Sequence, residues 1–228
     1  MHWQCGSASG ICATRGRDLI CAIRGTDDKL DARQDIDLSD ASARAAAFAH
    51  GIKSHAAPGA RVHQGFVTHA LLSLHGIGGT VNIDDYETVW ITGHSLGGAA
   101  SALIVDMIDA GVLDRCRVFT FGAPATHSVL REQATGPRIV RVTRTTDPVP
   151  SLPPGYQHRD SVTLHLRYQG CVRTTPGAFG TLCRWLYLFA GAASLPLRAA
   201  GYQPRWLPRA TYAGHFIEKY ITDLEPFQ

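Results

Sequence analysis

The chain lacks the long apolar segments that mark membrane-spanning and conventionally exported proteins. Its 228 residues hold no run of about 18 uncharged apolar residues, the length that a spanning helix needs. The first residues also lack the charged and then apolar order of a secretion signal. We therefore expect neither a spanning helix nor a conventional signal peptide.

Metal-binding spacings are missing as well. The six cysteines form no Cys-x-x-Cys pair, and no His-Glu-x-x-His motif occurs among the eleven histidines. Five of the histidines gather loosely without a zinc spacing: His50, His55, His63, His69 and His75. We expect surface and core histidines there, no metal site and no cofactor.

Lysine is scarce, with three residues against nineteen arginines, and the charges are unevenly distributed. Residues 27–40 hold six aspartates, whereas residues 138–209 hold ten arginines and two acids. A basic segment of this kind suits an anionic lipid surface or a nucleic acid. We expect most of these arginines to be solvated surface residues, and we expect no nucleic acid partner.

What the chain does contain is the composition of one folded domain. Hydrophobic residues make up 45% of the sequence and charged residues 18%, which is typical of soluble globular proteins. The length also suits a single domain with a sizeable core. Because no internal repeat or low-complexity linker interrupts it, we expect one domain over residues 1–228.

Segments with strand and helix patterns alternate along this domain. Strand patterns occupy residues 11–14, 19–24, 88–92, 117–121, 138–143 and 161–167. Helical patterns occupy residues 41–49, 66–74 and 96–110. The alternation predicts an α/β fold, with a mostly parallel central sheet and helices on both faces.

Two cysteines would face each other in the first hairpin. If residues 15–18 form a tight turn, Cys12 and Cys21 lie on opposite strands. A disulfide and a pair of reduced, half-buried thiols both fit that placement, and we favour the thiols.

A Gly-x-Ser-x-Gly turn carries the clearest chemical signal. The strand pattern at 88–92 is followed by Gly-His-Ser-Leu-Gly at 93–97 and then by an alanine-rich helical segment. A sharp strand-to-helix turn exposes the central serine, and the two glycines remove Cβ atoms that would clash across it. The free N–H groups at the start of the helix would face developing negative charge. Ser95 is therefore a candidate nucleophile.

A serine nucleophile needs a histidine base and a carboxylate that orients the histidine. Asp147 follows the strand pattern at 138–143, in a proline-rich loop. His215 lies near the C-terminus, where a loop meets a short helical segment. Their order after Ser95 is the order of serine, acid and histidine in α/β-hydrolases.

The motifs around these residues closely resemble those of the class 3 lipases, the family of filamentous-fungal triacylglycerol lipases and their bacterial relatives. The matching segments are 23–26 (Ile-Arg-Gly-Thr), 62–66 (Val-His-Gln-Gly-Phe), 91–98 (Ile-Thr-Gly-His-Ser-Leu-Gly-Gly), 119–124 (Phe-Thr-Phe-Gly-Ala-Pro), 147–150 (Asp-Pro-Val-Pro) through 153–154 (Pro-Pro), His158, and His215 in Gly-His-Phe. They follow the family's order and cover most of the chain. The resemblance implies an α/β-hydrolase fold and hydrolysis of carboxylic esters.

The resemblance also implies roles for individual residues. We expect Ser95 to be the nucleophile, Asp147 the acid and His215 the base. The oxyanion hole is expected to use the backbone N–H groups of Thr26 and Leu96, helped by the Thr26 hydroxyl. Four further residues of the motifs are expected to support the turn: His63, Gly93, His94 and Gly97.

Two segments depart from the family pattern and bear on the substrate. Residues 27–36 are polar, where fungal members carry an amphipathic lid helix. Residues 178–200 are apolar, with four side chains at helical spacing: Leu182, Trp185, Leu186 and Phe189. A helix packed on the domain and a lipid-touching flap both fit this pattern. We hypothesise that residues 178–200 are an apolar cap insertion that faces the substrate and contacts the membrane peripherally.

The leading interpretation is a serine carboxylic ester hydrolase of the lipase or phospholipase type. It would cleave acyl esters of glycerolipids through an acyl-enzyme on Ser95. The alternatives are a short-chain or aryl esterase, a secreted lipase-type effector toxin with an immunity or chaperone partner, and a non-catalytic binding protein. We expect a protein of the bacterial cytoplasm, or one exported by a dedicated secretion system.

Overall fold

The fold is seen in a computed structural model of the chain. It describes residues 1–25, 40–42, 61–127, 139–144, 146–153, 155–158, 162–166, 172–173, 215 and 217–224, with residues 40–42 and 172–173 described by their backbone alone.

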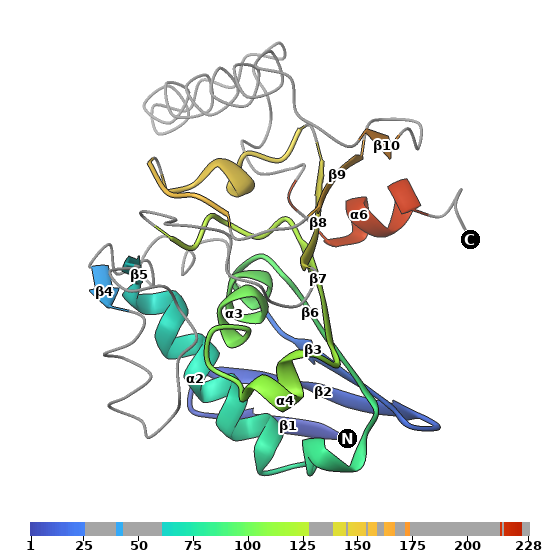
Figure 1. Cartoon of the computed structure of the whole chain (residues 1–228). Coiled ribbons are helices and arrows are strands. Elements are labelled where there is room, and N and C mark those ends of the chain that lie inside the picture. The colour runs from blue at the N-terminus through green and yellow to red at the C-terminus, as the bar shows by residue number, and fades with distance from the viewer. Residues whose placement is uncertain are drawn as a thin grey trace, which may run out of the picture.

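Eight of the described strands form one sheet in the order β1-β2-β3-β6-β7-β8-β9-β10 (Figure 1), and two short strands, β4 (Asp40–Ser42) and β5 (Arg61–His63), pair separately. The bounds of the eight are β1 His2–Cys5, β2 Ala8–Arg15, β3 Asp18–Ile23, β6 Thr88–His94, β7 Cys116–Phe121, β8 Ile139–Arg144, β9 Val162–Leu166 and β10 Val172–Arg173. β3, β6, β7, β8 and β9 are parallel neighbours, while β1, β2 and β10 pair antiparallel. The mostly parallel sheet that the sequence predicts is confirmed.

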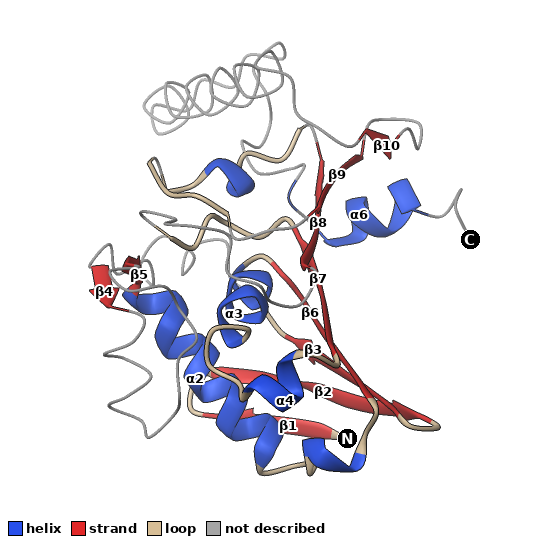
Figure 2. Cartoon of the chain, in the orientation of Figure 1, coloured by secondary structure: helices blue, strands red, loops and turns tan. Residues whose placement is uncertain are grey.

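Helices lie on both faces of the sheet, as expected (Figure 2). α2 (Gln64–Gly78), α3 (Leu96–Ile104) and α4 (Ala110–Leu113) lie on one face, and α6 (Ile217–Leu224) lies on the other. Buried side chains of β3, β6 and β7 join those of α2 and α3 in the main apolar core. A smaller core forms under α6, where Tyr220 packs on Val142 and Leu166. Within the described ranges, no helix has the length and apolarity to cross a bilayer.

The first hairpin forms as predicted but is longer. Arg15 pairs with Asp18 across a two-residue turn, and Gly16 takes a positive φ of 59°, which glycine adopts without a steric penalty. The strand predicted at 11–14 is the centre of β2, and the strand predicted at 19–24 is β3 shifted by one residue. The sequence analysis missed the short edge strand β1, which adds to β2.

Two predicted helices differ from the observed structure. The helix expected at 96–110 ends at Ile104, and the chain turns before α4 begins at Ala110. In this turn the carboxylate of Asp106 pairs with the buried His127, a tertiary contact that helical periodicity does not reveal.

The helix expected at 41–49 is wrong at its start, because Ala41 pairs with Val62 where β4 (Asp40–Ser42) meets β5 (Arg61–His63). Strand pairing overrides the helix propensity of alanine there; residues 43–49 lie outside the described ranges.

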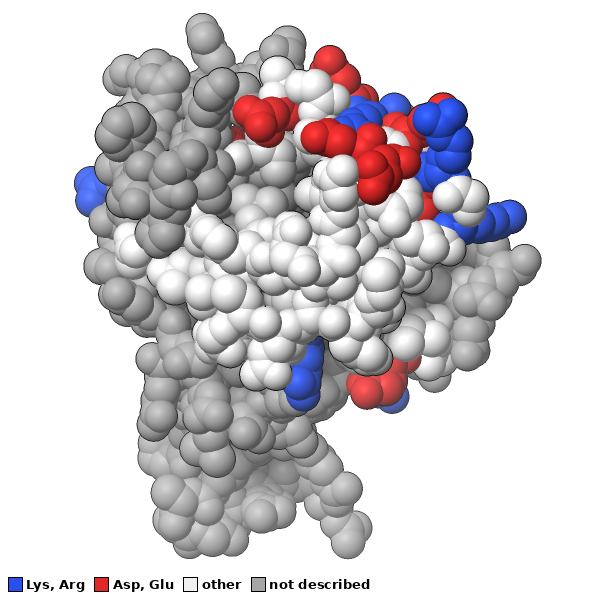
Figure 3. Space-filling model, turned by 90° about the horizontal axis from the view of Figure 1, so that it is seen from below, with Lys and Arg blue, Asp and Glu red and all other residues white. Residues whose placement is uncertain are grey.

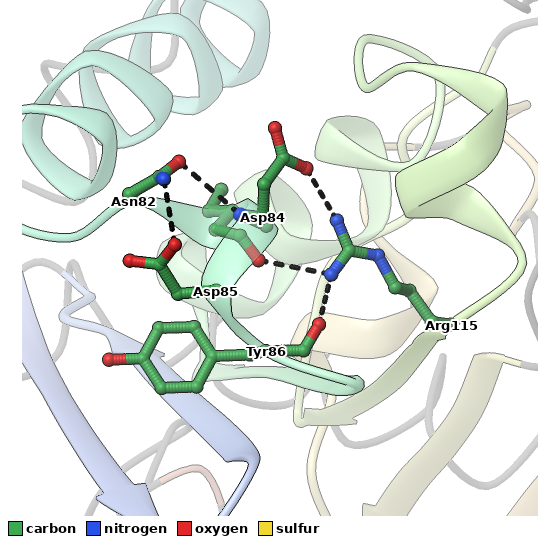
Figure 4. A network of polar contacts seen from close by, with 6 residues as sticks. Asn82, Asp84, Asp85, Tyr86 and Arg115 are labelled. Carbon is green, nitrogen blue, oxygen red and sulfur yellow. Dashed lines mark hydrogen bonds and ion pairs between the residues drawn. The ribbon is translucent and has the colours of Figure 1, made fainter.

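A polar network fixes the end of the sheet where β6 and β7 begin (Figure 4). The guanidinium of Arg115 donates to the carbonyls of Ile83 and Tyr86 and pairs with Asp84 at 2.6 Å. Asn82 caps the short 3-10 helix Ile83–Asp85 that leads into β6. Seen from below, the charged side chains in the described part of this end are of both signs and lie close together (Figure 3). The candidate site lies at the opposite end of the parallel strands.

Candidate active site

Ser95 lies in the turn between β6 and α3, half-buried, at φ 57° and ψ −125°. Among the described residues it is the one non-glycine residue with a positive φ. A side chain is rarely held there, because the conformation costs on the order of 1–3 kcal/mol and must be imposed by the surroundings. The Ser95 N–H donates to the Phe121 carbonyl at 3.0 Å, which ties the turn to β7.

The surroundings that impose this turn are backbone atoms. A Cβ added to Gly93 would lie 2.3 Å from the carbonyl carbon of Gly97, and one added to Gly97 would lie 2.2 Å from the Ile23 carbonyl oxygen. No side chain tolerates such distances. β6, α3 and the end of β3 therefore approach each other so closely that only glycine fits at Gly93 and Gly97. The supporting role expected for these two glycines matches their positions.

The end of β3 brings a further segment against the serine. A Cβ added to Gly25 would lie 3.4 Å from the Ser95 Cβ and 2.6 Å from the His94 carbonyl oxygen. The imidazole of His69, from α2, forms a hydrogen bond of 3.2 Å with the Arg24 carbonyl and so ties the end of β3 to α2. Thr26 is the next residue and lies outside the described ranges. Leu96 is half-buried and is the first residue of α3, so its N–H has no partner within the helix.

Asp147 lies just beyond the end of β8, and its side chain is fully buried. Its Oδ2 accepts from His215 Nδ1 at 2.9 Å and from the Tyr220 hydroxyl at 2.5 Å. Its Oδ1 accepts from the Val149 N–H at 2.9 Å. A buried carboxylate that accepts three hydrogen bonds is held in one position and can orient the imidazole beside it.

His215 is held at both its ring and its backbone. Its Nδ1 donates to Asp147, which leaves the other ring nitrogen, Nε2, as the one able to take up a proton. His94 Nε2 donates to the His215 carbonyl at 2.5 Å, and the two rings lie 4.6 Å apart between centroids. Burial, followed by the neighbouring His215, lowers the pKa of His94 to about 4. His94 is therefore neutral above that pH and acts as a hydrogen-bond donor to the backbone.

Sequence analysis missed two residues of this cluster. Tyr220 is fully buried in α6, and its hydroxyl donates to Asp147 while accepting from the Arg144 N–H at 3.2 Å. Gly122 has a φ of 57°, and a Cβ there would lie 2.8 Å from Asp147 Oδ2 and 3.1 Å from His215 Nδ1. Gly122 is part of the 119–124 motif and could have been found from it. Tyr220 has no sequence signal, since one tyrosine in a short helix is unremarkable.

The remaining expected site residues lie elsewhere. His63 is fully buried at the end of β5, where its ring stacks on Phe66 at 4.2 Å and meets Tyr156 edge-on. The expected cap residues lie outside the described ranges: Leu182, Trp185, Leu186 and Phe189. In the described part of the chain, no three His, Cys, Asp or Glu side chains are grouped so that they could hold a metal ion.

Taken together, the geometry places a serine on a strained turn, a histidine with one free ring nitrogen and a buried carboxylate at one edge of a parallel sheet. Hydrogen bonds link the carboxylate of Asp147 to His215, and His215 to His94, the residue before the serine. Such a set suits nucleophilic catalysis, in which the histidine activates the hydroxyl.

Known structures share this fold. The Lip2 lipase of Yarrowia lipolytica is 23% identical, with the match covering 82% of this chain and 75% of that chain at a TM-score of 0.64. Lipase II from Rhizopus niveus is 21% identical over 78% of this chain and 69% of that chain, at a TM-score of 0.60. The triacylglyceride lipase of Rhizomucor miehei is 21% identical over 76% of this chain and 68% of that chain, at a TM-score of 0.56. These likenesses show an α/β-hydrolase fold.

The family follows from the sequence match. A family model described as Lipase (class 3) matches residues 20–157, which is more than half of the 228 residues. The match includes the Ser95 turn and Asp147. The chain therefore belongs to the class 3 lipase family and is a carboxylic ester hydrolase of the lipase type.

Proposed function

We propose that the enzyme cleaves acyl esters of glycerolipids through an acyl-enzyme on Ser95, with His215 as general base and Asp147 as the acid that orients it. The observation that carries the proposal is the 2.9 Å contact between His215 Nδ1 and the buried carboxylate of Asp147. It fixes the tautomer in which His215 Nε2 is free to accept a proton. Ser95, on its strained turn, supplies the hydroxyl.

In the first half of the reaction, Ser95 Oγ attacks the ester carbonyl while His215 Nε2 takes up the hydroxyl proton. The tetrahedral intermediate collapses as the proton passes from His215 to the leaving alcohol, and an acyl-serine remains. In the second half, His215 takes a proton from water, which attacks the acyl-serine, and Ser95 is regenerated with release of the fatty acid. Asp147 stabilises the imidazolium in both halves.

The oxyanion of both tetrahedral intermediates is proposed to be held by the N–H groups of Leu96 and Thr26. The position of Leu96 at the start of α3 supports its part, because the N–H groups there are free and lie at the positive end of the helix dipole. The packing of Gly25 against Ser95 supports the part of Thr26, which follows in the chain. Loss of one such donor typically raises the barrier by about 3 kcal/mol.

The substrate class is proposed from the sequence on either side of the site. Residues 178–200 combine apolar aromatic side chains with arginines, as interfacial segments do. We propose that this segment is a cap that faces lipid, with phospholipid preferred over neutral triglyceride because the surrounding half of the chain is basic. Deleting 178–200 should then lower turnover of lipid vesicles more than turnover of a short soluble ester. Equal loss on both substrates would contradict a lipid-specific cap.

The central test compares the wild-type enzyme with Ser95→Ala on p-nitrophenyl esters of increasing chain length and on phosphatidylcholine and phosphatidylglycerol vesicles. We expect wild-type turnover of long-chain esters and vesicles, and a loss of at least about 10³-fold in Ser95→Ala. Ser7→Ala, an exposed serine in the turn between β1 and β2, is the matched control and should retain full activity.

Two outcomes would overturn parts of the proposal. If Ser95→Ala kept wild-type turnover, or if the wild-type enzyme were inactive on every ester, the acyl-enzyme on Ser95 would be wrong. If only the short-chain p-nitrophenyl esters were hydrolysed, the enzyme would be a short-chain or aryl esterase. The polar segment 27–36 at the usual lid position is the feature that favours this second candidate.

A further inference from the structure

Two buried cysteines lie opposite each other in the first hairpin, away from the reaction site. Cys12 of β2 and Cys21 of β3 are register partners, and their Sγ atoms are 3.4 Å apart. Their exposed fractions are 1% and 0%, and both are free thiols. Nothing in the proposed reaction uses either group.

The strand register sets the distance between their backbones. The Cys12 N–H donates to the Met1 carbonyl at 2.8 Å, and the Cys12 carbonyl accepts from the Met1 nitrogen at 2.7 Å. Both backbone groups of Cys12 are therefore turned toward the Met1 side and away from β3. In an antiparallel ladder, such a residue forms a non-hydrogen-bonded pair with its partner on the other strand, and the Cα atoms of that pair are about 4.5 Å apart.

This separation is at the short end of what a disulfide spans, about 4.4–6.8 Å between Cα atoms. A bond between the two sulfurs therefore needs a shift of side chains and no rearrangement of the strands. A bond at the short limit is strained, and strained disulfides are reduced more readily than relaxed structural ones. The geometry favours a bond that both forms and opens.

We propose that Cys12 and Cys21 are a reversible two-electron redox site, which hydrogen peroxide closes to a cross-strand disulfide and a small thiol reopens. The Cys12 thiolate attacks one peroxide oxygen, the O–O bond breaks, and hydroxide leaves, so that Cys12 becomes a sulfenic acid. The Cys21 sulfur then attacks the Cys12 sulfur, and the displaced hydroxide leaves as water with the Cys21 proton. In sum, two thiols and one peroxide give one disulfide and two waters.

The electrostatics of the pair favour Cys12 as the attacking group. The hydrogen bond between the two sulfurs lowers the pKa of the Cys12 thiol, against the opposing effect of burial. The same contact and burial raise the pKa of Cys21, which keeps its proton until it attacks. Both thiols belong to the apolar core between the sheet and α2, so the oxidant has to be small and uncharged, as hydrogen peroxide is.

The test treats the folded, full-length chain with a small excess of hydrogen peroxide, blocks the remaining thiols with N-ethylmaleimide and digests with trypsin. Cleavage at Arg15, Arg17 and Arg24 separates the two cysteines. We expect a linked species that joins residues 1–15 to residues 18–24, two hydrogens lighter than the sum of the two peptides. Dithiothreitol added before the blocking step should release the two peptides. Cys116 is equally buried but its register partner on β6 is Val89, so it should remain a thiol and serves as the internal control.

Variants separate the proposed bond from its neighbours. Peptide 1–15 also contains Cys5, so Cys5→Ser must still form the linked species, and Cys12→Ser and Cys21→Ser must not. Formation of the linked species in the wild-type chain and its release by dithiothreitol test the proposal even if a variant fails to fold. A link through Cys5 would overturn the proposal, as would stable sulfinic acid on Cys12 without a link, or unmodified Cys12 and Cys21 after peroxide treatment.

Discussion

The two halves of the candidate site are built in different ways. The Ser95 turn is made of consecutive residues, and close approaches between backbone atoms fix its shape. The acid and base half is made mainly of side chains that lie far apart in the sequence, His215 and Tyr220, joined by hydrogen bonds to Asp147. The first half depends on the absence of a Cβ at Gly93 and Gly97, and the second depends on the donors to Asp147, with one glycine, Gly122, packed against them.

This difference predicts different sensitivities. One added methyl group should damage the turn, because the atoms it would meet are backbone atoms that cannot move aside. The acid and base half should tolerate changes of volume better than the loss of a proton donor or a charge, since a buried carboxylate left without partners is destabilised. The variants below separate the two kinds of damage.

The largest effect is expected for Asp147→Asn in the acid and base half. The amide keeps the volume but cannot hold the tautomer of His215 or stabilise its charged form, so kcat should fall by about 10⁴-fold while the fold persists. Steady-state kinetics on a soluble ester measures kcat, and circular dichroism of the same sample shows whether the protein is folded.

Asp106→Asn is the matched control for that variant. Asp106 is also a buried carboxylate paired with a histidine, His127, at 3.2 Å, but the pair lies outside the reaction site. Asp106→Asn should lower the midpoint of thermal unfolding and leave kcat per folded molecule unchanged. Equal losses of kcat in both variants would contradict a specific role for Asp147.

In the Ser95 turn, Gly97→Ala should destabilise the fold by about 3 kcal/mol or more, because its Cβ would lie 2.2 Å from the Ile23 carbonyl oxygen. Gly111→Ala in α4 meets nothing within 4 Å and should be neutral or stabilise the protein by about 0.5–1 kcal/mol. Urea denaturation of the two variants measures the contrast. A Gly97→Ala protein as stable as Gly111→Ala would contradict the backbone account of the turn.

Tyr220→Phe keeps the ring but removes one donor to Asp147 and the acceptor of the Arg144 N–H. A hydrogen bond to a charged group contributes about 1.5–3 kcal/mol, so kcat should fall by roughly 10–100-fold with little change in KM. Tyr86→Phe, at the far end of the sheet, is the control, because only its carbonyl joins the Arg115 network (Figure 4). In the double variant Asp147→Asn with Tyr220→Phe, kcat should be little lower than in Asp147→Asn alone, because the partner of the Tyr220 hydroxyl is already altered.

The smallest effect concerns stability at low pH and involves His94, which links the two halves. Burial lowers the pKa of both His94 and His127 to about 4, whereas an unfolded histidine takes up its proton near 6.5. Between these values the unfolded state binds more protons, so the free energy of unfolding should fall as the pH falls from about 6.5 to 4. Urea titrations at several pH values should show a shallower fall in His94→Gln; an unchanged slope would contradict the assignment.

The sequence reveals one half of the site better than the other for a physical reason. The Ser95 turn needs glycines at fixed spacing within one segment, so it can be recognised from a short motif of consecutive residues. Asp147 and His215 are visible through their motifs and their order. Tyr220 and the Arg144–Asp223 ion pair that anchors α6 are not visible, because the contact depends on how a distant helix docks. The roles predicted for Thr26 and for residues 178–200 remain predictions.

The most direct test of the central account is covalent trapping of Ser95 with an alkyl fluorophosphonate. We expect one adduct per chain on the tryptic fragment 62–115, located by fragmentation at Ser95. Ser73 and Ser101 in the same fragment donate to carbonyls of their own helices and should stay unmodified. An adduct at either of them, or equal labelling of Ser95→Ala, would contradict the account.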